Sequence, residues 1–600
     1  MKRLTFALVV IAFALTAMAQ PHVKHPDKKK NMSSTPNDKL TIYQLMPRLF
    51  GNKNTTNKFY GSIEENGCGK FNDINETALT ELKKLGITHV WYTGVVSHAT
   101  MTDYSAYGIP VDDPDVVKGR AGSPYAVKDY YDVDPDLAVD VKKRMDEYQS
   151  LIERTHKTGL KVLMDFVPNH VARTYHSPAA GKQSFGVADD KTKAFDPKND
   201  FYYIPGKPFV APQGYNSGGA NFNSPLKDGN FDENPAKATG NDVFSASPSI
   251  DDWFETIKLN YGIDYSTHKT FFDPIPPVWQ KMFDILNFWS KQGVDGFRCD
   301  MVENVPTEFW GWVIGKLKET HPDLIFIGEA YDKSKYNNYL TNGKFNYLYD
   351  KSGLYDSIKK LTRHEDSGTI WDINGVWNYD TKGIGSHMVR FMENHDEQRV
   401  ASPFFAGNVW YAIPGMIITA TLSTGPVMIY FGQEVGEPGM GTEGFSAEDG
   451  RTSIFDYWGV PQHQKWVNGG KYDGGALSDE QKSLRNFYSK LLNAVKDNEA
   501  LSRGEFYELM LANGKSPGVD THTYIYLRYT ANKRVLIITN FNREERNMNV
   551  QLTPDLIRLL KLNGVVKFTD LLHGASYSTA DITKGLDITL PATSGVMLEF

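Results

Sequence analysis

GVDGFRCD, at residues 293–300, is the stretch that decides the fold of this chain. It predicts one short strand that ends in a carboxylate, Asp300. Side chains alternate across a strand, so Gly296, Arg298 and Asp300 share one face. An arginine two residues before an aspartate keeps that carboxylate ionised and aimed, as a nucleophile requires, although a structural ion pair at a strand end has the same pattern. The other strand ends decide between these two interpretations.

A pattern of strand followed by helix extends from this stretch in both directions. Apolar residues recur at helical spacing over 75–85, 137–158, 278–291 and 309–318. Gly86, Gly159 and Gly293 stand where three of these helices should end. The predicted strands, in chain order, are 41–46, 87–96, 160–167, 293–300, 323–329, 345–349, 389–396 and 425–431. Eight such units predict a parallel β/α barrel, whose active site lies at the C-terminal ends of the strands.

Two parts of the chain break this pattern. Residues 171–274 are rich in Gly, Asn, Asp and Pro, and they are too many for a structureless loop, so we predict an inserted domain there. After a predicted helix at 481–495, short strands at 521–529, 534–540, 566–570 and 596–600 predict a C-terminal β-sandwich. We therefore assign 39–170 and 275–498 to the catalytic barrel, 171–274 to the inserted domain and 499–600 to the C-terminal domain.

The first residues have the features of a signal peptide, at 1–19. Lys2 and Arg3 precede an apolar run, and the small residues Ala17 and Ala19 predict cleavage before Gln20. The run is too short to span a bilayer as a stable helix, and no comparable run follows. After a disordered lead-in at 20–38, the mature protein is expected to be exported, to the periplasm or the extracellular space.

Composition narrows the class of protein. With 600 residues, of which 40% are hydrophobic and 13% aromatic, the chain can bury a large core. A formal net charge of -7 provides no basic surface for a nucleic-acid partner. The two cysteines, Cys68 and Cys299, form no zinc motif, and we expect no disulfide between them because Cys299 lies in a buried strand beside Asp300.

Acidic side chains gather at the ends of the predicted strands. Asp300, Glu329 and Asp396 end the fourth, fifth and seventh strands, and a barrel brings these ends to one face. His170 and His395 lie beside them. Glycoside hydrolysis requires two carboxylates across one sugar bond, one to attack or to activate water and one to protonate the leaving oxygen. Because like charges raise one another's pKa, at least one acid can hold a proton near neutral pH and act as a general acid.

Four short motifs stand in order at the strand ends. They are DFVPNH at 165–170, GFRCD at 296–300, GEA at 328–330 and NHD at 394–396. These resemble the four signature regions of the alpha-amylase family of glycoside hydrolases. The inserted segment is similar to that family's domain B, and the last hundred residues resemble its domain C. The resemblance implies hydrolysis of alpha-glucosidic bonds in starch-like glucans or maltooligosaccharides.

The resemblance also implies a role for each acid. Asp300 would be the nucleophile that forms a covalent glycosyl intermediate, and Glu329 would be the general acid and base. Asp396 would be a carboxylate that holds and distorts the bound sugar. No cofactor is expected for this chemistry.

Four further residues would bind or orient. His170 and His395 would bind hydroxyls of the sugar, and Arg298 would orient Asp300. Tyr125, in an aromatic and acidic loop after the second strand, resembles the family's stacking tyrosine.

Two features leave alternatives open. Asn169 resembles a position that binds a structural calcium ion in some members, and a turn-capping amide is the alternative, so the metal ligands are unknown. Glu303 and Asn304 stand where many alpha-amylases carry Lys-His, at positions that touch the leaving-group sugar. This departure argues against endo-acting starch hydrolysis and leaves maltooligosaccharide hydrolysis, branched-glucan cleavage or glucan transfer open. Three function hypotheses remain: a retaining hydrolase, a transglycosylase on the same site, and a catalytically silent glycan-binding barrel, against which the three intact acids argue.

Overall fold

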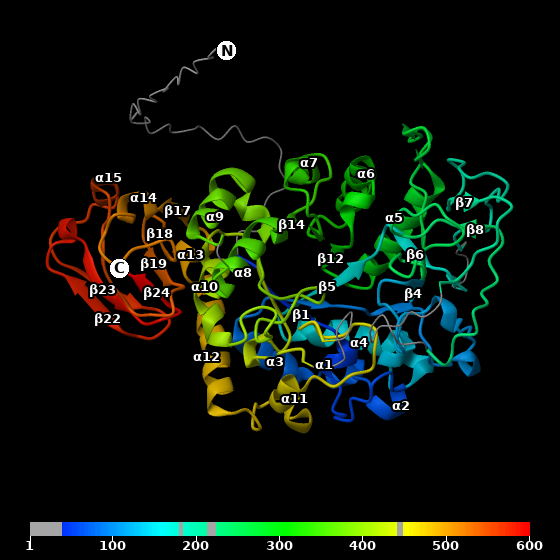
Figure 1. The fold of residues 1–600 in the computed structure, drawn as a ribbon, viewed down its shortest axis with the longest axis horizontal. Helices are drawn as coiled ribbons and strands as arrows, with labels where there is room; N and C mark the ends of the chain where they lie inside the picture. Colours follow the sequence, from blue (N-terminus) through cyan, green and yellow to red (C-terminus); the bar gives the residue numbers. More distant parts are fainter. Residues whose placement is uncertain (1–38, 179–183, 213–223, 366, 441–447) are drawn as a thin grey trace, which may run out of the picture. The chain divides into compact units, whose positions relative to one another are not determined.

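The structure is a computed structural model that describes residues 39–178, 184–212, 224–365, 367–440 and 448–600 (Figure 1). The predicted signal peptide at 1–19 and the lead-in at 20–38 lie outside these residues, so export stays a prediction. Among the helices described, none is both long enough and apolar enough to cross a membrane. Cys68 and Cys299 are free thiols, as predicted.

Eight parallel strands form the predicted barrel. Their order in the sheet is β15-β14-β13-β12-β5-β2-β1-β16. A parallel bridge between Arg390, directly after β15, and Val427 in β16 joins the two ends of the sheet. The strands are β1 (Thr41–Leu45), β2 (His89–Tyr92), β5 (Lys161–Phe166), β12 (Gly296–Cys299), β13 (Ile325–Gly328), β14 (Tyr347–Tyr349), β15 (Met388–Val389) and β16 (Val427–Tyr430). All eight overlap their predicted ranges.

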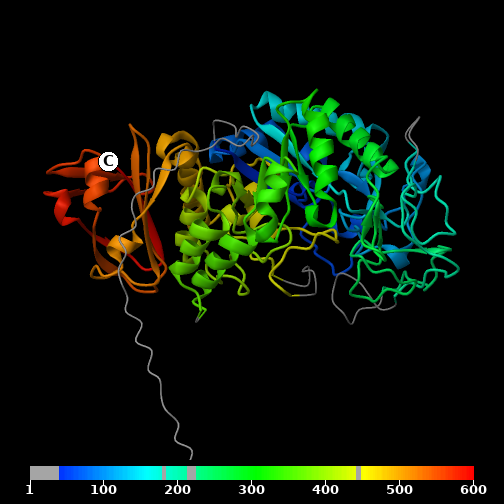
Figure 2. The ribbon, with the colours of Figure 1, turned by 90° about the horizontal axis from the view of Figure 1, so that it is seen from above.

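Helices lie outside the barrel strands (Figure 2). The predicted stripe of α5 is buried, with Val278, Met282, Ile285 and Trp289 in the core. Gly293 follows this helix with a φ of 95°, a left-handed conformation that favours glycine. The helices that match predictions are α3 (Glu76–Leu85), α4 (Arg144–Lys157), α5 (Pro277–Lys291), α6 (Thr307–Lys318) and α12 (Asp479–Asp497). The helix predicted at 137–158 begins at Arg144, seven residues later than predicted. Two 3-10 turns, at Pro135–Leu137 and Val141–Lys143, precede it.

The seventh strand is much shorter than the predicted 389–396. The chain leaves the sheet after Arg390 and turns at Asn394, whose Oδ1 accepts hydrogen bonds from the N–H groups of Asp396 and Glu397 at 2.8 and 3.0 Å. An amide side chain that binds the backbone two residues ahead favours a turn over a strand. Asp396 consequently lies on a loop beyond the strand.

The inserted segment is built from short antiparallel pairs. These are β6 (His170–Ala172) with β9 (Thr256–Lys258), β7 (Tyr203–Ile204) with β8 (Ala236–Lys237), and β10 (Ile263–Asp264) with β11 (Lys269–Thr270). A separate apolar cluster forms a core beneath them, made of Val116, Phe209, Ala211, Ala236 and Phe254. Because β6 starts at His170, the last residue of the DFVPNH motif, this segment begins beside the strand ends. The domain boundaries themselves stay a prediction.

The C-terminal part is antiparallel, in agreement with the predicted β-sandwich. A six-stranded sheet has the order β17-β18-β19-β24-β21-β22, and β20 pairs with β23. Predicted strands at 534–540 and 566–570 coincide with β19 (Arg534–Asn540) and β21 (Val566–Asp570). The others are β17 (Glu505–Glu508), β18 (Thr523–Tyr529), β20 (Arg546–Val550), β22 (Ser576–Thr579), β23 (Leu586–Leu590) and β24 (Ser594–Glu599).

Candidate active site

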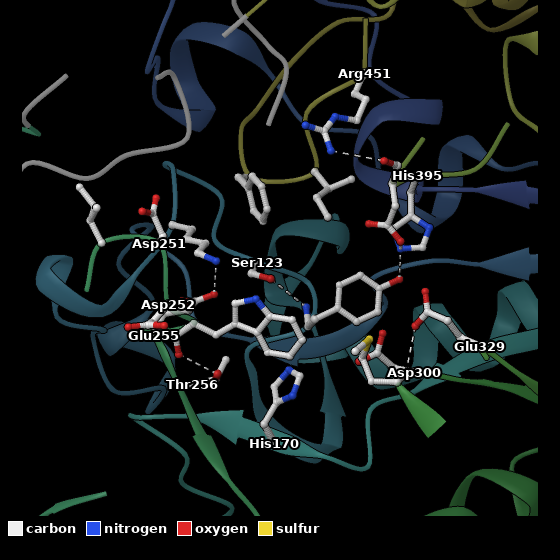
Figure 3. Close-up of a pocket in the computed structure, with 18 of the residues that line it drawn as sticks. Ser123, His170, Asp251, Asp252, Glu255, Thr256, Asp300, Glu329, His395 and Arg451 are labelled. Atoms are coloured by element: carbon white, nitrogen blue, oxygen red, sulfur yellow. Dashed lines mark hydrogen bonds and ion pairs between the residues drawn. The ribbon is translucent and has the colours of Figure 1, made fainter. Parts of the chain in front are cut away.

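The polar strand ends meet in one pocket, a cavity of about 420 Å³ (Figure 3). Asp300 and Glu329 directly follow β12 and β13, and Asp396 reaches the pocket from the loop after β15. Of the seven predicted site residues, the pocket brings together six, which are Tyr125, His170, Asp300, Glu329, His395 and Asp396. The seventh, Arg298, is fully buried beside them.

Arg298 is the positive centre of the site. Its Nη1 donates to Asp300 Oδ1 at 2.7 Å, so the contact expected from strand alternation is present. Its Nη2 lies 2.6 Å from Glu329 Oε1, and Nη1 lies 3.8 Å from Asp165 Oδ1. Three aromatic rings lie 5.3–5.6 Å from the guanidinium carbon, those of Trp91, Tyr125 and Tyr349. One rigid, planar group thus orients two neighbouring carboxyls.

Burial raises the pKa of all three acids. For Asp300 burial is the main cause, and the contact with Arg298 opposes it. For Glu329 burial again dominates, Arg298 opposes it, and the charge of Asp300 raises the pKa further. The pKa of Asp396 lies well above its ordinary value because of burial and the charge of Glu329. Since one guanidinium cannot neutralise three carboxylates, burial and mutual repulsion favour the protonated form of at least one of the acids.

Two donors hold Glu329 from other directions. The Met301 N–H donates to Oε2 at 2.9 Å, and the Tyr331 hydroxyl donates to Oε1 at 2.7 Å. Hydrogen bonds to a carboxylate favour its ionised form, and both bonds lower the pKa of Glu329 against the larger effect of burial. Tyr331 also lines the pocket, although the sequence offered no signal for it.

Glu303 has a different role from the one expected at its position. Its carboxylate accepts hydrogen bonds from the backbone N–H groups of Tyr331 and Asp332 at 3.2 and 2.9 Å. Both carboxylate oxygens of Glu303 are therefore engaged by the loop after β13. Glu303 holds the loop that carries Tyr331, and this pairing across two loops has no signature in the sequence.

His395 and Tyr125 form one wall of the pocket. Gln44 Nε2 donates to Nδ1 of His395 at 2.8 Å, which leaves Nε2 as the protonated ring nitrogen. That nitrogen lies 2.6 Å from the Tyr125 hydroxyl and 3.1 Å from Asp396 Oδ2. Burial and the charge of Arg298 hold the pKa of His395 well below its ordinary value, so the ring is neutral. The two rings stack, with centroids 5.2 Å apart.

The inserted segment supplies the opposite wall (Figure 3). His170, at the start of β6, lies edge-on to Trp253 with ring centroids 5.4 Å apart. Burial lowers the pKa of His170 to about 4, so this ring is neutral too. Glu255 and Thr256 extend the wall, and Lys118 pairs with Glu255 at 2.7 Å.

Asn169, the candidate calcium ligand, already contacts a cation. Its Oδ1 accepts a hydrogen bond from Lys258 Nζ at 2.8 Å, and the same ammonium lies 2.5 Å from Asp242 Oδ1. Calcium takes about 6–8 oxygen ligands, and here two oxygens face a positive charge. Within the described ranges, no group of three or more His, Cys, Asp or Glu side chains is arranged to hold a metal ion. The residues around Asn169 do not fit a calcium ion while Lys258 occupies this position.

The model of the alpha-amylase catalytic domain matches residues 44–504 of this chain. The chain belongs to the alpha-amylase family. It is 25% identical over 458 residues to alpha-amylase 3 of Dictyoglomus thermophilum, covering 71% of this chain and 75% of that protein. It is 22% identical to the trehalose-6-phosphate hydrolase of Bacillus subtilis, covering 86% and 92%. Like its relatives, this member is a glycoside hydrolase of the family that acts on alpha-glucans.

Solved structures of the family share the fold. A maltogenic alpha-amylase from Thermotoga neapolitana has a TM-score of 0.59 at 18% identity, with 94% of this chain and 98% of that chain covered. A gamma-cyclodextrin glucanotransferase (gamma-CGTase) from an alkalophilic Bacillus clarkii has a TM-score of 0.61 at 17% identity, with 95% and 71% covered. The predicted barrel is therefore confirmed.

Proposed function

We propose that this alpha-amylase-family member hydrolyses alpha-glucosidic bonds of starch-like glucans or maltooligosaccharides with retained configuration. The observation that carries the proposal is that Arg298 contacts Asp300 and Glu329 through two nitrogens of one guanidinium. Retaining enzymes hold the pair about 5–5.5 Å apart, whereas inverting enzymes need about 6.5–9.5 Å to admit a water molecule. The close pair supports retention.

In the first step Glu329 is the acid and Asp300 the nucleophile. Glu329 gives its proton to the glycosidic oxygen, and the bond from that oxygen to the anomeric carbon breaks. An Asp300 oxygen forms a new bond to the same carbon, which produces a covalent glycosyl-aspartate. Burial and the neighbouring acid, which raise the pKa of Glu329, favour the proton it needs. Arg298 favours ionised Asp300 through the opposing effect of its charge.

In the second step the same Glu329 becomes the base. It takes a proton from a water molecule, whose oxygen attacks the anomeric carbon and releases Asp300. The Tyr331 hydroxyl and the Met301 N–H already point at the Glu329 carboxylate and stabilise the ionised form that this step needs. Glu329 must be protonated in the first step and ionised in the second. Burial favours its protonated form, and the two hydrogen-bond donors favour its ionised form.

The remaining pocket residues would bind the sugar. Asp396 would accept hydrogen bonds from hydroxyls of the sugar that is cleaved, and the protonated Nε2 of His395 would donate to them. His170 would contact the same sugar from the wall opposite. The ring of Tyr125 would stack on its apolar face, as aromatic side chains do on sugar rings.

Transfer to a second sugar is the alternative outcome of the same intermediate. Among the matched proteins, an alpha-1,4-glucan:maltose-1-phosphate maltosyltransferase of Cereibacter sphaeroides is 33% identical, over 15% of this chain and 16% of that protein. Incubation with maltoheptaose distinguishes the two reactions. A hydrolase yields only shorter products, whereas a transglycosylase also yields chains longer than seven units.

Replacing each carboxylate tests the assignment of roles. On 4-nitrophenyl alpha-maltoside, Glu329→Ala should still form the intermediate, because nitrophenolate needs little protonation to leave. Azide, which needs no general base, should then restore turnover and yield a glycosyl azide of retained configuration. Asp300→Ala should form no intermediate, whatever the leaving group.

The opposite pattern would reverse the roles. If azide rescues Asp300→Ala to an azide of inverted configuration and leaves Glu329→Ala inactive, the assignment is wrong. Asp323→Ala is a matched control, because this exposed acid precedes β13 at the end away from Glu329. It should keep the activity of the natural protein with and without azide.

A further inference from the structure

We propose that the Lys258 ammonium fills a cation site between the barrel and the inserted segment, so that this protein needs no metal ion there. Lys258 ends β9, where its backbone pairs with His170 in β6. Its side chain is only 2% exposed. A buried lysine ammonium is stable only with polar partners, so the groups that contact Lys258 show what its side chain does there.

The two oxygens that face the ammonium come from different parts of the chain. Asn169 lies at the end of the DFVPNH motif, after β5, and its Oδ1 lies 2.8 Å from Lys258 Nζ. Asp242 lies in a turn of the inserted segment, and its Oδ1 lies 2.5 Å away. The ring of Tyr265, also from the inserted segment, lies 5.4 Å from Nζ and adds a cation–π contact. One ammonium therefore links the barrel motif to the inserted segment.

The turn that carries Asp242 is shaped for this contact. Asp242 has a φ of 66°, in the left-handed region that few residues other than glycine adopt. Its N–H donates to the Thr239 carbonyl at 3.1 Å, which closes the turn. The neighbouring Gly240 carbonyl accepts a hydrogen bond from Asn169 Nδ2 at 2.7 Å. The amide nitrogen of Asn169 thus binds the turn, and its amide oxygen binds Lys258.

This link reaches the substrate pocket through His170. A Cβ atom at Gly240 would lie 2.9 Å from Cγ of His170, so the turn packs directly against that ring. The Gly240 N–H also donates to the Thr256 hydroxyl at 3.3 Å, and both His170 and Thr256 line the pocket. Lys258 is accordingly a positioning residue for this wall, although it touches no substrate itself.

The charges match one ammonium rather than a divalent ion. Among the residues that the structure describes, Asp242 supplies the one carboxylate paired with Lys258 Nζ, and Asn169 is neutral. Burial lowers the pKa of Lys258, and Asp242 opposes that effect. A calcium ion at the same oxygens would lie in contact with a like charge, which is unfavourable in a buried place. Lys258 thus provides the link and excludes the metal.

Thermal unfolding with calcium as the probe tests this inference. The melting temperature of the natural protein should be the same in CaCl₂ and in EDTA. Lys258→Ala should lower it by several degrees, because Asp242 then lacks its partner. Calcium should raise the melting temperature of Lys258→Ala, and EDTA should reverse the gain, because the Asp242 and Asn169 oxygens then face the vacated space without a competing cation and water molecules can supply the other ligands. In the double variant Lys258→Ala/Asp242→Asn, calcium should have no effect.

A matched control separates this site from other lysine contacts. Lys193 also lies in the inserted segment and pairs with Asp196 at 2.6 Å, but its side chain is 53% exposed. Lys193→Ala should have the melting temperature of the natural protein, with and without calcium, since exposed ion pairs contribute little to stability.

Two results would overturn the proposal. The first is a Lys258→Ala protein that folds but gains nothing from calcium. The second is a natural protein whose melting temperature falls in EDTA, with that fall absent from Asp242→Asn. If Lys258→Ala does not fold, the natural protein and Asp242→Asn still test the proposal. The proposal requires that EDTA leaves the melting temperature of both proteins unchanged.

Discussion

Replacing Arg298 by lysine should weaken catalysis without removing the positive charge. The guanidinium contacts Asp300 through Nη1 at 2.7 Å and Glu329 through Nη2 at 2.6 Å. A lysine ammonium is a compact charge on a flexible stem and cannot reproduce this planar fork. One of the two carboxyls should therefore lose its direct contact, while the charge nearby remains.

The expected loss follows from that one contact. A hydrogen bond to a charged group contributes about 1.5–3 kcal/mol. Since each 1.36 kcal/mol corresponds to a factor of ten in rate, kcat/KM should fall by roughly 10- to 150-fold in Arg298→Lys. The loss should appear in kcat, because Arg298 is buried and contacts the two acids rather than the sugar.

The pH profile of kcat/KM on maltoheptaose, whose sugar leaving group needs protonation by Glu329, gives a second readout. The Arg298 charge lowers the pKa of both acids against the larger effect of burial. If Asp300 loses its contact, its pKa rises and the acid limb, which requires ionised Asp300, moves to higher pH. If Glu329 loses its contact, its pKa rises and the alkaline limb, which requires protonated Glu329, also moves to higher pH. Neither limb should move to lower pH.

Arg528→Lys is the control for loss of a buried arginine as such. Arg528 is also buried, but its Nη1 donates to the Leu422 carbonyl at 3.0 Å and its Nη2 donates to the Gly504 carbonyl, both of which are backbone groups far from the pocket residues in the sequence. It should lower the melting temperature and leave the pH profile in place. A folded Arg298→Lys protein with less than about a threefold loss, under 1 kcal/mol, and an unshifted profile would refute the role given to Arg298.

Two further substitutions address single contacts in the pocket. Tyr331→Phe removes a hydrogen-bond donor that favours ionised Glu329, so the pKa of Glu329 should rise. The alkaline limb of kcat/KM should then move to higher pH, and a limb that stays in place would contradict this. Tyr125→Ala removes a ring that stacks on His395 and faces the pocket, so kcat/KM should fall while circular dichroism shows a folded protein. Tyr125→Phe keeps the ring and should retain most of the activity, and unchanged kinetics in folded Tyr125→Ala would refute the stacking role.

The barrel could be predicted because it depends on local periodicity. Strands that are buried on both faces are short apolar runs, and the helices between them carry an apolar stripe at 3.6-residue spacing. The acids could be placed at one face for the same reason, because parallel strands of a barrel end together. The contact from Arg298 to Asp300 followed from alternation along one strand. Each of these inferences uses residues within a few positions of one another.

Strand ends were less predictable than strand positions. The sequence predicts the 389–396 segment as one strand, yet β15 ends at Val389 and the last bridge to the sheet is at Arg390. The reason is the Asn394 side chain, which turns the backbone by binding Asp396 and Glu397. Such a local side-chain bond competes with the ladder of a sheet, and the outcome depends on whether a neighbouring strand is there to pair.

The sequence by itself determined the barrel, the order of the motifs and the gathering of Asp300, Glu329 and Asp396 at one face. Only the tertiary structure decided which groups hold those acids and walls in place. Gln44 contacts His395 across 351 positions of sequence, and Lys258 contacts Asn169 across 89. These partners meet because β1 packs against the loop after β15 and β9 packs against the loop after β5. No periodicity along the chain records which of these distant segments will be neighbours.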